Sequence, residues 1–363
     1  MTTLPDTRPA SAAAEMPRVR VMICDDSSVI RMLIARTLTA DPEIQVVASV
    51  SNGALAVDSL KRNPVDVVLL DVEMPVMDGL TALPLLLQVD PTVRIIVASA
   101  LTSAGAATAI RAIQAGAADC LQKPRAEARD SFAQDIRTRV LELGRGKPRR
   151  HAAIPVRQPA SPPIALRTGA RRTPLLLAIG SSTGGPQALF TLFGGLTRRL
   201  SQPIVVTQHM PPLFTRSLAE HLARIGHRPC VEAEDGMTLL PDRVHVAPGD
   251  RHLLVESAGD RLVARIVDAP PENSCRPSVD PMLRSAVAAC QGRVLTVILT
   301  GMGRDGAAGA RCVVEAGGAV LAQDEASSVV WGMPGVVARE GLCQAVLPLD
   351  RIAAKIAELA VAS

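Results

Sequence analysis

Apolar positions along the first third of the chain alternate between two patterns. Five short runs rich in β-branched residues are separated by stretches in which apolar residues recur every three or four positions. The runs span residues 19–24, 44–49, 65–70, 93–99 and 119–123. Strands that alternate with helices in this way predict a doubly wound α/β domain over residues 18–142, with a parallel sheet and helices on both faces.

A second region with the same alternation begins at residue 174. Its clearest strand candidates are residues 175–179, 203–208 and 294–300, each followed closely by glycine or proline. The pattern predicts a second doubly wound, Rossmann-like parallel sheet over residues 174–363. A length of 363 residues agrees with two domains, because about 150 residues per domain is usual.

The segment between these regions, residues 143–173, has a different composition. Its stretch 145–173 contains eight Lys or Arg residues, five Pro and no acidic residue. Such a segment buries too little apolar surface to fold, which predicts a basic, Pro-rich linker. It could contact DNA or an anionic lipid surface, but a solvated spacer is the more ordinary role. Residues 1–17 are predicted to form a disordered tail.

The net charge of +4 is therefore a property of the linker. Without its eight basic residues, the chain has 31 basic against 35 acidic residues, a net charge of −4. Only four Phe, one Trp and no Tyr are present, which argues against a base-stacking surface for single-stranded nucleic acid. The seven cysteines are scattered, as is typical of reduced thiols. Because apolar runs are short and no secretory signal is evident, we expect a cytoplasmic protein without a membrane span.

Polar side chains follow the predicted strands of the first domain. Asp25 and Asp26 come after the first strand, Asp71 after the third, Ser99 closes the fourth and Lys123 ends the fifth. The carboxyl ends of parallel strands meet at one edge of a sheet, so these groups should converge. Three converging carboxylates favour a hard cation such as Mg²⁺. One carboxylate could then attack phosphorus, while the Lys and the hydroxyl hold the phosphoryl oxygens.

These residues resemble the receiver domain of two-component response regulators over the whole of residues 18–142, which implies a flavodoxin-like fold. The resemblance is carried by the acid pair, by Asp71 in LLDVEMPVMDG, by Ser99 and by Lys123-Pro124. It implies that Asp71 is phosphorylated and that Ser99 and Lys123 contact the phosphoryl group. It also implies a Mg²⁺ site formed by Asp26, Asp71 and the backbone carbonyl of Glu73, with Asp25 in the same acidic pocket.

The second domain opens with a glycine-bounded serine motif. Gly180-Ser181-Ser182-Thr183-Gly184 is a G-x-S-x-G sequence between a predicted strand and a predicted helix. This is the setting of a nucleophile elbow, in which a tight turn exposes the central Ser182. A phosphate-binding glycine loop and a plain structural turn remain alternatives, although neither the G-x-G-x-x-G nor the Walker pattern is present.

A serine nucleophile needs a base and an acid that orients the base. Among six histidines, His209 is the one that ends a predicted strand. Asp305 follows another strand, within the sequence GMGRDG. Both would lie at the sheet edge that carries Ser182. A helix cap or a turn residue is the alternative interpretation of Asp305, and the order Ser, His, Asp differs from that of the α/β-hydrolases.

Six ordered segments of residues 174–363 resemble the catalytic domain of the chemotaxis protein-glutamate methylesterase/glutamine deamidase (CheB) family. They are IGSSTGGPQAL, QHMPPLFTRSLAEHL, VAPGDRHL, CRPSVDPML, VILTGMGRDGAAGA and QDEASSVVWGMPGVV. The resemblance implies Ser182 as nucleophile, His209 as general base and Asp305 as orienting acid. It further implies that the Met302 N–H stabilises the oxyanion and that Thr183 lies in the substrate pocket.

The resemblance also implies the biological role. Such an enzyme demethylates glutamate methyl esters and deamidates glutamines on chemoreceptors, without a cofactor for the hydrolase. Its unphosphorylated receiver covers the catalytic cleft until the chemotaxis histidine kinase phosphorylates it. Two other interpretations stay open. One is a DNA-binding response regulator that uses the basic linker, which the negative remainder of the chain disfavours. The other is a receiver-linked hydrolase that acts on a different ester or amide.

Overall fold

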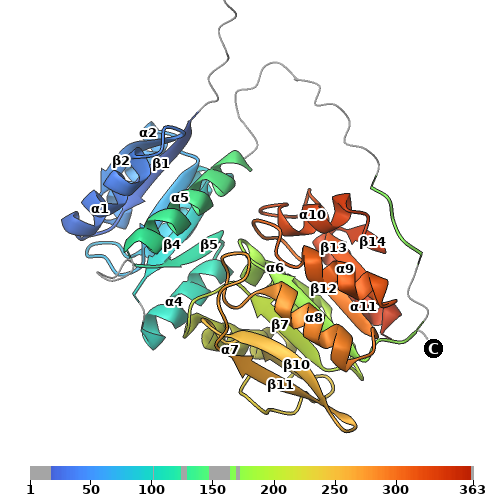
Figure 1. Cartoon of the computed structure of the whole chain (residues 1–363). Coiled ribbons are helices and arrows are strands. Elements are labelled where there is room, and N and C mark those ends of the chain that lie inside the picture. Colours follow the sequence, from blue (N-terminus) through green and yellow to red (C-terminus); the bar gives the residue numbers. More distant parts are fainter. Residues whose placement is uncertain (1–17, 101, 124–128, 147–163, 169–171, 361–363) are drawn as a thin grey trace, which may run out of the picture.

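The computed structural model describes residues 18–100, 102–123, 129–146, 164–168 and 172–360, which form two domains, each built on a parallel sheet (Figure 1). The predicted tail (1–17), Pro124 and most of the predicted linker (147–163 and 169–171) lie outside the described residues. Within these residues, no helix is both long and apolar enough to cross a bilayer.

The described part of the first domain contains a five-stranded parallel sheet in the order β2-β1-β3-β4-β5. This order confirms the flavodoxin-like prediction, and the strands match the five predicted apolar runs to within two residues at either end. The strands are β1 (Val19–Cys24), β2 (Ile44–Val50), β3 (Val67–Asp71), β4 (Arg94–Ser99) and β5 (Asp119–Gln122). The helices are α1 (Ser28–Thr39), α2 (Gly53–Arg62), α3 (Gly79–Val89), α4 (Ser103–Gln114) and α5 (Arg129–Arg145).

Local sequence explains where these helices begin. The first four each start after a residue whose side-chain oxygen accepts a hydrogen bond from a backbone amide of the first turn, namely Ser27, Asn52, Asp78 and Thr102. Such caps satisfy an amide that has no partner within the helix. At the other end of the domain, α5 continues to Arg145 and buries Leu143. The first three residues of the range predicted as linker are therefore helical, because Leu143 extends the apolar face of the helix.

The described part of the second domain contains a seven-stranded parallel sheet in the order β14-β13-β12-β6-β7-β9-β8, with an antiparallel hairpin of β10 and β11 beside it. This confirms the prediction of a doubly wound α/β domain. The strands are β6 (Leu176–Ser181), β7 (Ile204–Gln208), β8 (Cys230–Glu232), β9 (Val244–Val246), β10 (His252–Ala258), β11 (Arg261–Val267), β12 (Val294–Ile298), β13 (Ala319–Gln323) and β14 (Ala345–Leu347). The helices are α6 (Gly185–Gly195), α7 (Phe214–Gly226), α8 (Val279–Ala289), α9 (Ala307–Glu315), α10 (Met333–Arg339) and α11 (Leu349–Leu359).

The centre of this sheet positions the candidate site. Strand β6 lies between β12 and β7, and all three point the same way. Their carboxyl ends therefore meet at one edge, next to the point where the strand order reverses. The predicted strand ends at Ile179, two residues before the observed end of β6. The strand continues through Gly180 and Ser181, because Ser181 still pairs with Gln208 of β7.

Two surfaces of the receiver contact the second domain. Helix α4 packs against α7 and α6 (Figure 1). The second contact lies at the end of α5. Gly146 is so close to Val329 there that a Cβ atom added to the glycine would be 3.3 Å from the Val329 carbonyl oxygen. Met302 and Val329 pack against a hydrophobic cluster that includes Ile136 of α5. The receiver is thus in contact with the loops that follow β12 and β13 of the second domain.

The described end of the linker also contacts the second domain. Ile164 packs against the core of that domain, and the Arg167 N–H donates to the Cys343 carbonyl at 2.9 Å. Ile164 therefore anchors the end of the linker to the second domain, whereas residues 165–168 are exposed to solvent.

Candidate active site and phosphorylation site

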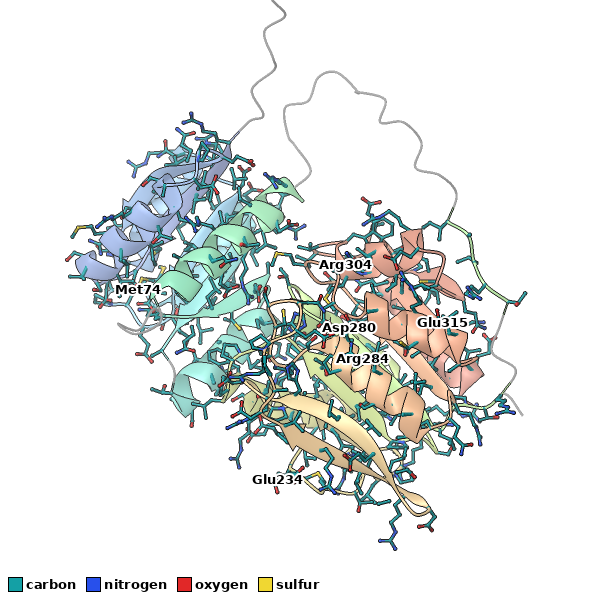
Figure 2. The ribbon with its side chains drawn as sticks, in the orientation of Figure 1. Met74, Glu234, Asp280, Arg284, Arg304 and Glu315 are labelled. Atoms are coloured by element: carbon teal, nitrogen blue, oxygen red, sulfur yellow. The ribbon has the colours of Figure 1, made fainter. Side chains whose placement is uncertain are left out.

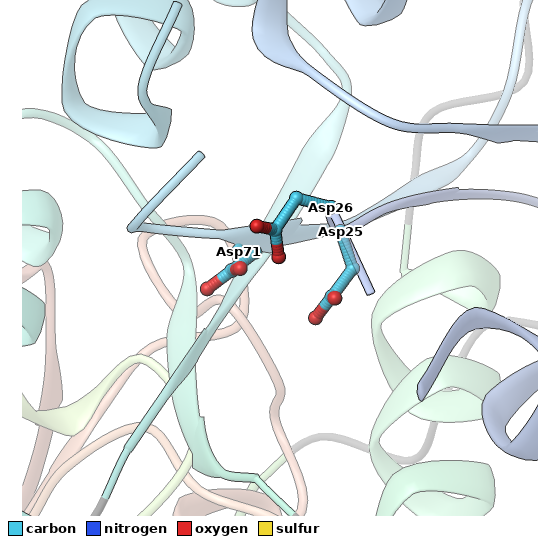
Figure 3. A group of neighbouring side chains, drawn as sticks. All are labelled: Asp25, Asp26 and Asp71. Carbon is cyan, nitrogen blue, oxygen red and sulfur yellow. The ribbon is translucent and has the colours of Figure 1, made fainter. Parts of the chain in front are cut away.

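Three carboxylates converge at the carboxyl edge of the first sheet. Asp25 and Asp26 follow β1, and Asp71 ends β3, which is the neighbouring strand. One oxygen from each lies within 4.8 Å of the others. Figure 3 shows the three side chains. Asp25 and Asp71 are buried, whereas Asp26 is exposed. A cluster of carboxylate oxygens with one exposed member fits a hard divalent cation that reaches it from solvent.

Lys123 approaches the same cluster from β5. Its Nζ lies 2.9 Å from Asp25 Oδ2 and 2.7 Å from Asp71 Oδ2. Burial raises the pKa of Asp71, and the ion pair with Lys123 offsets part of that rise. A carboxylate must be ionised to attack phosphorus, and the positive charge of Lys123 favours the ionised form of Asp71.

Ser99 and Glu73 lie beside this cluster. Ser99 is buried at the end of β4, and its carbonyl accepts the Lys123 N–H at 2.9 Å. The Glu73 N–H donates to Asp71 Oδ1 at 3.4 Å. The structure thus brings all five predicted polar positions of the first sheet together, with Glu73 in the adjoining loop. The role of the Glu73 carbonyl as a metal ligand stays a prediction.

Ser182 lies on a tight turn between β6 and α6. Its N–H donates to the Thr300 carbonyl at 3.0 Å, and its carbonyl accepts from Gly185 N at 2.7 Å. Gly184 has a φ of 75°, which favours glycine, and Pro186 lies in the first turn of α6. The turn is therefore a strand–turn–helix junction of the type that exposes a nucleophile.

The neighbourhood of Ser182 is closely packed. Gln208 donates from Nε2 to the Ser182 carbonyl at 2.9 Å and accepts from the Ser181 hydroxyl at 2.6 Å. A Cβ on Gly301 would lie 2.8 Å from the Ser182 Cβ. Only glycine leaves room at position 301 for the serine turn, so the loop after β12 fixes the position of Ser182.

His209 and Asp305 are directly hydrogen-bonded. His209 follows β7, Asp305 lies in the loop before α9, and His209 Nε2 is 2.7 Å from Asp305 Oδ2. Burial raises the pKa of Asp305, but the hydrogen bond from His209 and other donors outweigh burial and lower it to about 2. Asp305 is therefore ionised at neutral pH, and Nε2 of His209 is the donor in this pair.

Asp305 accepts further hydrogen bonds from its surroundings. Within the described residues, its donors besides His209 are Asn273 Nδ2 (2.9 Å), Ser278 Oγ (2.7 Å), Val279 N (2.6 Å), Asp280 N (3.1 Å) and Gly306 N (2.9 Å). Val279 and Asp280 supply the first backbone amides of α8, whose positive dipole end favours a carboxylate. Figure 2 labels Asp280 at the start of this helix. Asp305 is thus a fixed anion.

The second ring nitrogen of His209 contacts a thiol. Cys275 Sγ lies 3.3 Å from His209 Nδ1. Burial lowers the pKa of His209, but its hydrogen bonds with Asp305 and Cys275 outweigh burial and raise it to about 10. In the part of the chain that the structure describes, the Ser182 hydroxyl makes no hydrogen bond to His209 or to any other residue. The ring therefore lies between Asp305 and Cys275.

The two remaining predicted residues flank the serine. Thr183 is buried, and its carbonyl accepts from the Thr300 hydroxyl at 3.0 Å. Met302 follows Gly301, and its N–H donates to no protein group among the described residues. A free amide next to Ser182 is available to a developing oxyanion.

Three of the other described histidines make contacts away from the serine. His252 is buried between the Pro270 carbonyl at 3.0 Å and the Ser278 N–H at 3.2 Å. His245 accepts from Leu240 N at 3.3 Å, and His221 contacts Arg224 at 2.8 Å. None is hydrogen-bonded to Asp305 in these ranges, which leaves His209 as the base candidate.

Sequence reasoning assigned no role to Asn273, Cys275, Ser278 or Gln208. Three of them belong to the segment 273–278, whose sequence NSCRPS is partly covered by the quoted motif CRPSVDPML. The motif therefore indicated that this segment belongs to the site. The contacts of its side chains with Asp305 and His209 are tertiary, and no strand pattern predicts them. Gln208 is adjacent to His209 and carried no separate signal.

Comparisons with known proteins agree with this two-domain arrangement. The family model for the CheB methylesterase matches residues 177–356, and that for the response regulator receiver domain matches residues 21–131. A protein-glutamate methylesterase/protein-glutamine glutaminase from Paramagnetospirillum magneticum is 50% identical, with 94% of this chain and 96% of that protein covered. A protein of the same description from Azospirillum brasilense is 49% identical, with 98% and 96% covered.

The second domain is also similar to a solved structure. The crystal structure of the Thermotoga maritima CheB methylesterase catalytic domain has a TM-score of 0.50 and 40% sequence identity. The match covers 53% of this chain and 100% of that one. The sequence likeness to full-length relatives thus extends over both sheets and both candidate sites.

Proposed function

Because this chain belongs to the CheB family of protein-glutamate methylesterases/protein-glutamine glutaminases, we propose that it is a phosphorylation-activated serine hydrolase acting on chemoreceptors in bacterial chemotaxis. The substrates are glutamate methyl esters and glutamine side chains. The observation that carries the proposal is the hydrogen bond of 2.7 Å between His209 and the ionised Asp305, at the sheet edge that holds Ser182. A base oriented in this way serves acyl transfer.

The reaction proceeds in two stages. Since Asp305 fixes the proton on Nε2, the basic nitrogen of neutral His209 is Nδ1. This nitrogen takes the Ser182 proton as Oγ attacks the γ-carbonyl carbon of the methylated glutamate. The Met302 N–H stabilises the oxyanion. Methanol leaves with the proton held by His209, and water then hydrolyses the acyl-enzyme. Glutamine follows the same path and releases ammonia.

The phosphorylation site supports regulation of this reaction. Asp71 accepts the phosphoryl group from the chemotaxis histidine kinase, and Lys123 and Ser99 hold its oxygens. The ion pair between Lys123 and Asp71 and the burial of Ser99 beside it support these roles. Asp26, Asp71 and the Glu73 carbonyl would hold Mg²⁺, with Asp25 beside them. When bound, the cation supplies the positive charge that lets a phosphoryl donor approach the carboxylates.

The contact between domains supports a route for that regulation. Val329 lies between the end of α5 and the serine turn. A Cβ atom added to Gly184 would be 2.6 Å from the Cβ of Val329, and one added to Gly146 would be 3.3 Å from the carbonyl oxygen of Val329. Helix α4, which follows Ser99 closely, packs on α7 and α6. A change at Ser99 on phosphorylation would weaken these contacts and uncover the site.

The proposal places the enzyme in the cytoplasm, where the reducing environment keeps its seven thiols reduced. The receptors would be its membrane-bound substrates and the kinase its phosphodonor. Neither DNA binding nor a hydrolase cofactor is part of the proposal, because the second domain is a mixed α/β fold with a serine site rather than a compact helical DNA-binding domain.

The test is methanol release from methyl-labelled chemoreceptor membranes, with and without a small-molecule phosphodonor plus Mg²⁺. Stimulated release that falls by several orders of magnitude in Ser182→Ala would support the substrate class, the nucleophile and the activation together. If folded wild-type protein released no more methanol than Ser182→Ala, the receptor would be wrong as a substrate. Labelling of Ser182 by a fluorophosphonate would then still test the hydrolase.

A further inference from the structure

The general base is held by two groups rather than one. Asp305 occupies His209 Nε2, and the Cys275 thiol occupies Nδ1 at 3.3 Å. Nδ1 is the nitrogen that must accept the Ser182 proton in the proposed reaction. We propose that Cys275 is a positioning residue that holds His209 in a resting state, so that the base must leave the thiol before it can activate Ser182. This inference rests on the proposed function.

The contact blocks the base in either protonation state. When the proton is on sulfur, the thiol donates to the Nδ1 lone pair. When the proton has moved to nitrogen, Nδ1 has no lone pair to offer and the thiolate accepts its hydrogen bond. In neither case can Nδ1 take a proton from Ser182. The Ser182 hydroxyl, accordingly, has no hydrogen bond to His209 within the described residues.

The position of Cys275 is fixed by a tight turn. The backbone amides and carbonyls of Glu272 and Cys275 exchange hydrogen bonds of 3.1 and 2.9 Å around Asn273 and Ser274. Both central residues have positive φ values, 53° and 61°. Such a two-residue turn aims its flanking side chains in a defined direction.

The turn is also tied to the rest of the site. The Asn273 amide donates to Asp305 and to Asp280, each at 2.9 Å. Arg284 of α8 makes two hydrogen bonds of 2.7 and 2.6 Å to Glu272. Because these contacts join the turn to α8 and to Asp305, the thiol and the carboxylate are presented to the ring as one unit.

The titratable groups around His209 explain the expected pH behaviour. Asp305 and Cys275 contact the ring directly, while Asp280 and Glu272 lie farther out, where the negative charge of Asp305 acts to raise their pKa values. The contact with Cys275 is one of the causes that raise the pKa of His209. Removing the thiol should therefore leave more of the base neutral near pH 7.

Two substitutions separate positioning from structural support. Cys275→Ala frees Nδ1, whereas Cys275→Ser keeps a hydroxyl donor on it, and neither variant can form a thiolate. The measurement is the rate at which a fluorophosphonate labels Ser182 in the full-length chain, from pH 5 to 10. Cys312→Ala, which changes a partly exposed thiol on α9, is the matched control.

We expect Cys275→Ala to be labelled about two- to tenfold faster than Cys275→Ser, the range of one hydrogen bond. Both variants should reach half-maximal labelling at a lower pH than wild type and Cys312→Ala. If Cys275→Ser matched wild type while Cys275→Ala were slower, with unchanged pH profiles, the thiol would be a packing group and the inference would be overturned.

A second measurement uses the unaltered cysteine. Cys275 in wild type should react with iodoacetamide at a rate that changes at least severalfold in His209→Gln, since the ring is its proton partner. Equal rates would overturn the inference even if the cysteine variants did not fold. If the fluorophosphonate failed to label wild-type Ser182 even in the presence of a phosphodonor and Mg²⁺, the triad and this inference would be overturned together. Labelling without methanol release from receptors would refute only the receptor substrate.

Discussion

At the residue scale, the chemistry of the second domain depends on the hydrogen bonds around one imidazole. Asp305 is ionised and fixed by amides from α8, so it holds the Nε2 proton of His209. Strong donation to a carboxylate keeps the ring in one tautomer and orientation. The same arrangement stabilises the protonated ring, which cannot act as a base. In the proposed mechanism, the resting site therefore has an oriented base that is mostly protonated at neutral pH.

The pH dependence follows from the His209 pKa of about 10. In unphosphorylated enzyme, the rate of Ser182 labelling should rise as pH increases toward 10, because only the neutral ring can act as a base. The stability of the fold has the opposite trend. Because the pKa of His209 is higher in the folded state than its usual value of 6.5, protonation of the ring stabilises the fold. This contribution is complete below pH 6.5 and is lost as the pH rises through about 10. The labelling rate measured from pH 6 to 10 checks the first trend, and thermal unfolding over the same pH range checks the second. A half-maximal rate near pH 6.5 would contradict this pKa.

Asp305→Asn tests the orientation of the base. An amide cannot accept the Nε2 proton as a carboxylate does, so the ring should lose its productive tautomer and the labelling rate should fall by about 10³- to 10⁴-fold. Asp324→Asn is the control, since that carboxylate bonds only to Ser327 among the described residues. A loss of less than tenfold in Asp305→Asn would mean that His209 is oriented by other contacts.

At the element scale, the ends of β6, β7 and β12 decide where the site residues meet. Each strand supplies one loop: the serine turn, His209, and the Gly301–Met302 loop that leads to Asp305. The strands pair in register, so a shift in one loop is transmitted to the others. Gly301 is the closest point of contact, because its α-carbon faces both Ser182 and Met333.

Gly301→Ala should therefore impair activity through position rather than chemistry. The added Cβ would lie 2.5 Å from Met333 Sδ and 2.8 Å from Ser182 Cβ, so the serine turn must move. We expect Ser182 labelling to fall by at least 100-fold, the scale of loss from a displacement of about 1 Å. Gly194→Ala in α6 is the control: its nearest atom is 3.4 Å away, and alanine favours helix by roughly 0.5–1 kcal/mol. Equal labelling of both variants would show that the turn tolerates the methyl group.

At the scale of the whole molecule, the receiver and the hydrolase form one structure. Helix α4 packs on α7, and Met302 and Val329 pack against the hydrophobic cluster that includes Ile136 of α5. The acidic cluster of the receiver and the serine turn are thus joined through packed elements, which can carry allosteric coupling. The chain that joins the domains also contributes a contact, through Arg167 and Cys343.

Phosphorylation should change the rate of Ser182 labelling by a factor that the coupling free energy between the two domains sets. A coupling of about 1–3 kcal/mol corresponds to roughly 5- to 150-fold faster labelling of Ser182 with a phosphodonor and Mg²⁺. The stimulation should vanish in Asp71→Asn, which has no carboxylate to phosphorylate. Stimulation that persisted in Asp71→Asn would place the phosphorylated residue elsewhere, and a phosphorylated chain without faster labelling would refute the coupling.

The sequence by itself determined the order of strands and helices and the chemical types at the strand ends. Alternating apolar runs record burial on a sheet, and Asp71, Ser182 and His209 follow such runs directly, so local patterns sufficed to select them. The end of β6 and the length of α5 were misjudged because pairing with Gln208 and burial of Leu143 are tertiary effects.

Only the tertiary structure decided how the base is held. Cys275 and Asp305 are separated from His209 by 66 and 96 positions, and no local pattern brings them to its two nitrogens. Their arrangement depends on a tight turn, on the start of α8 and on the central position of β6. Contacts of this kind arise from packing between distant segments, which the local pattern of apolar and polar residues does not record.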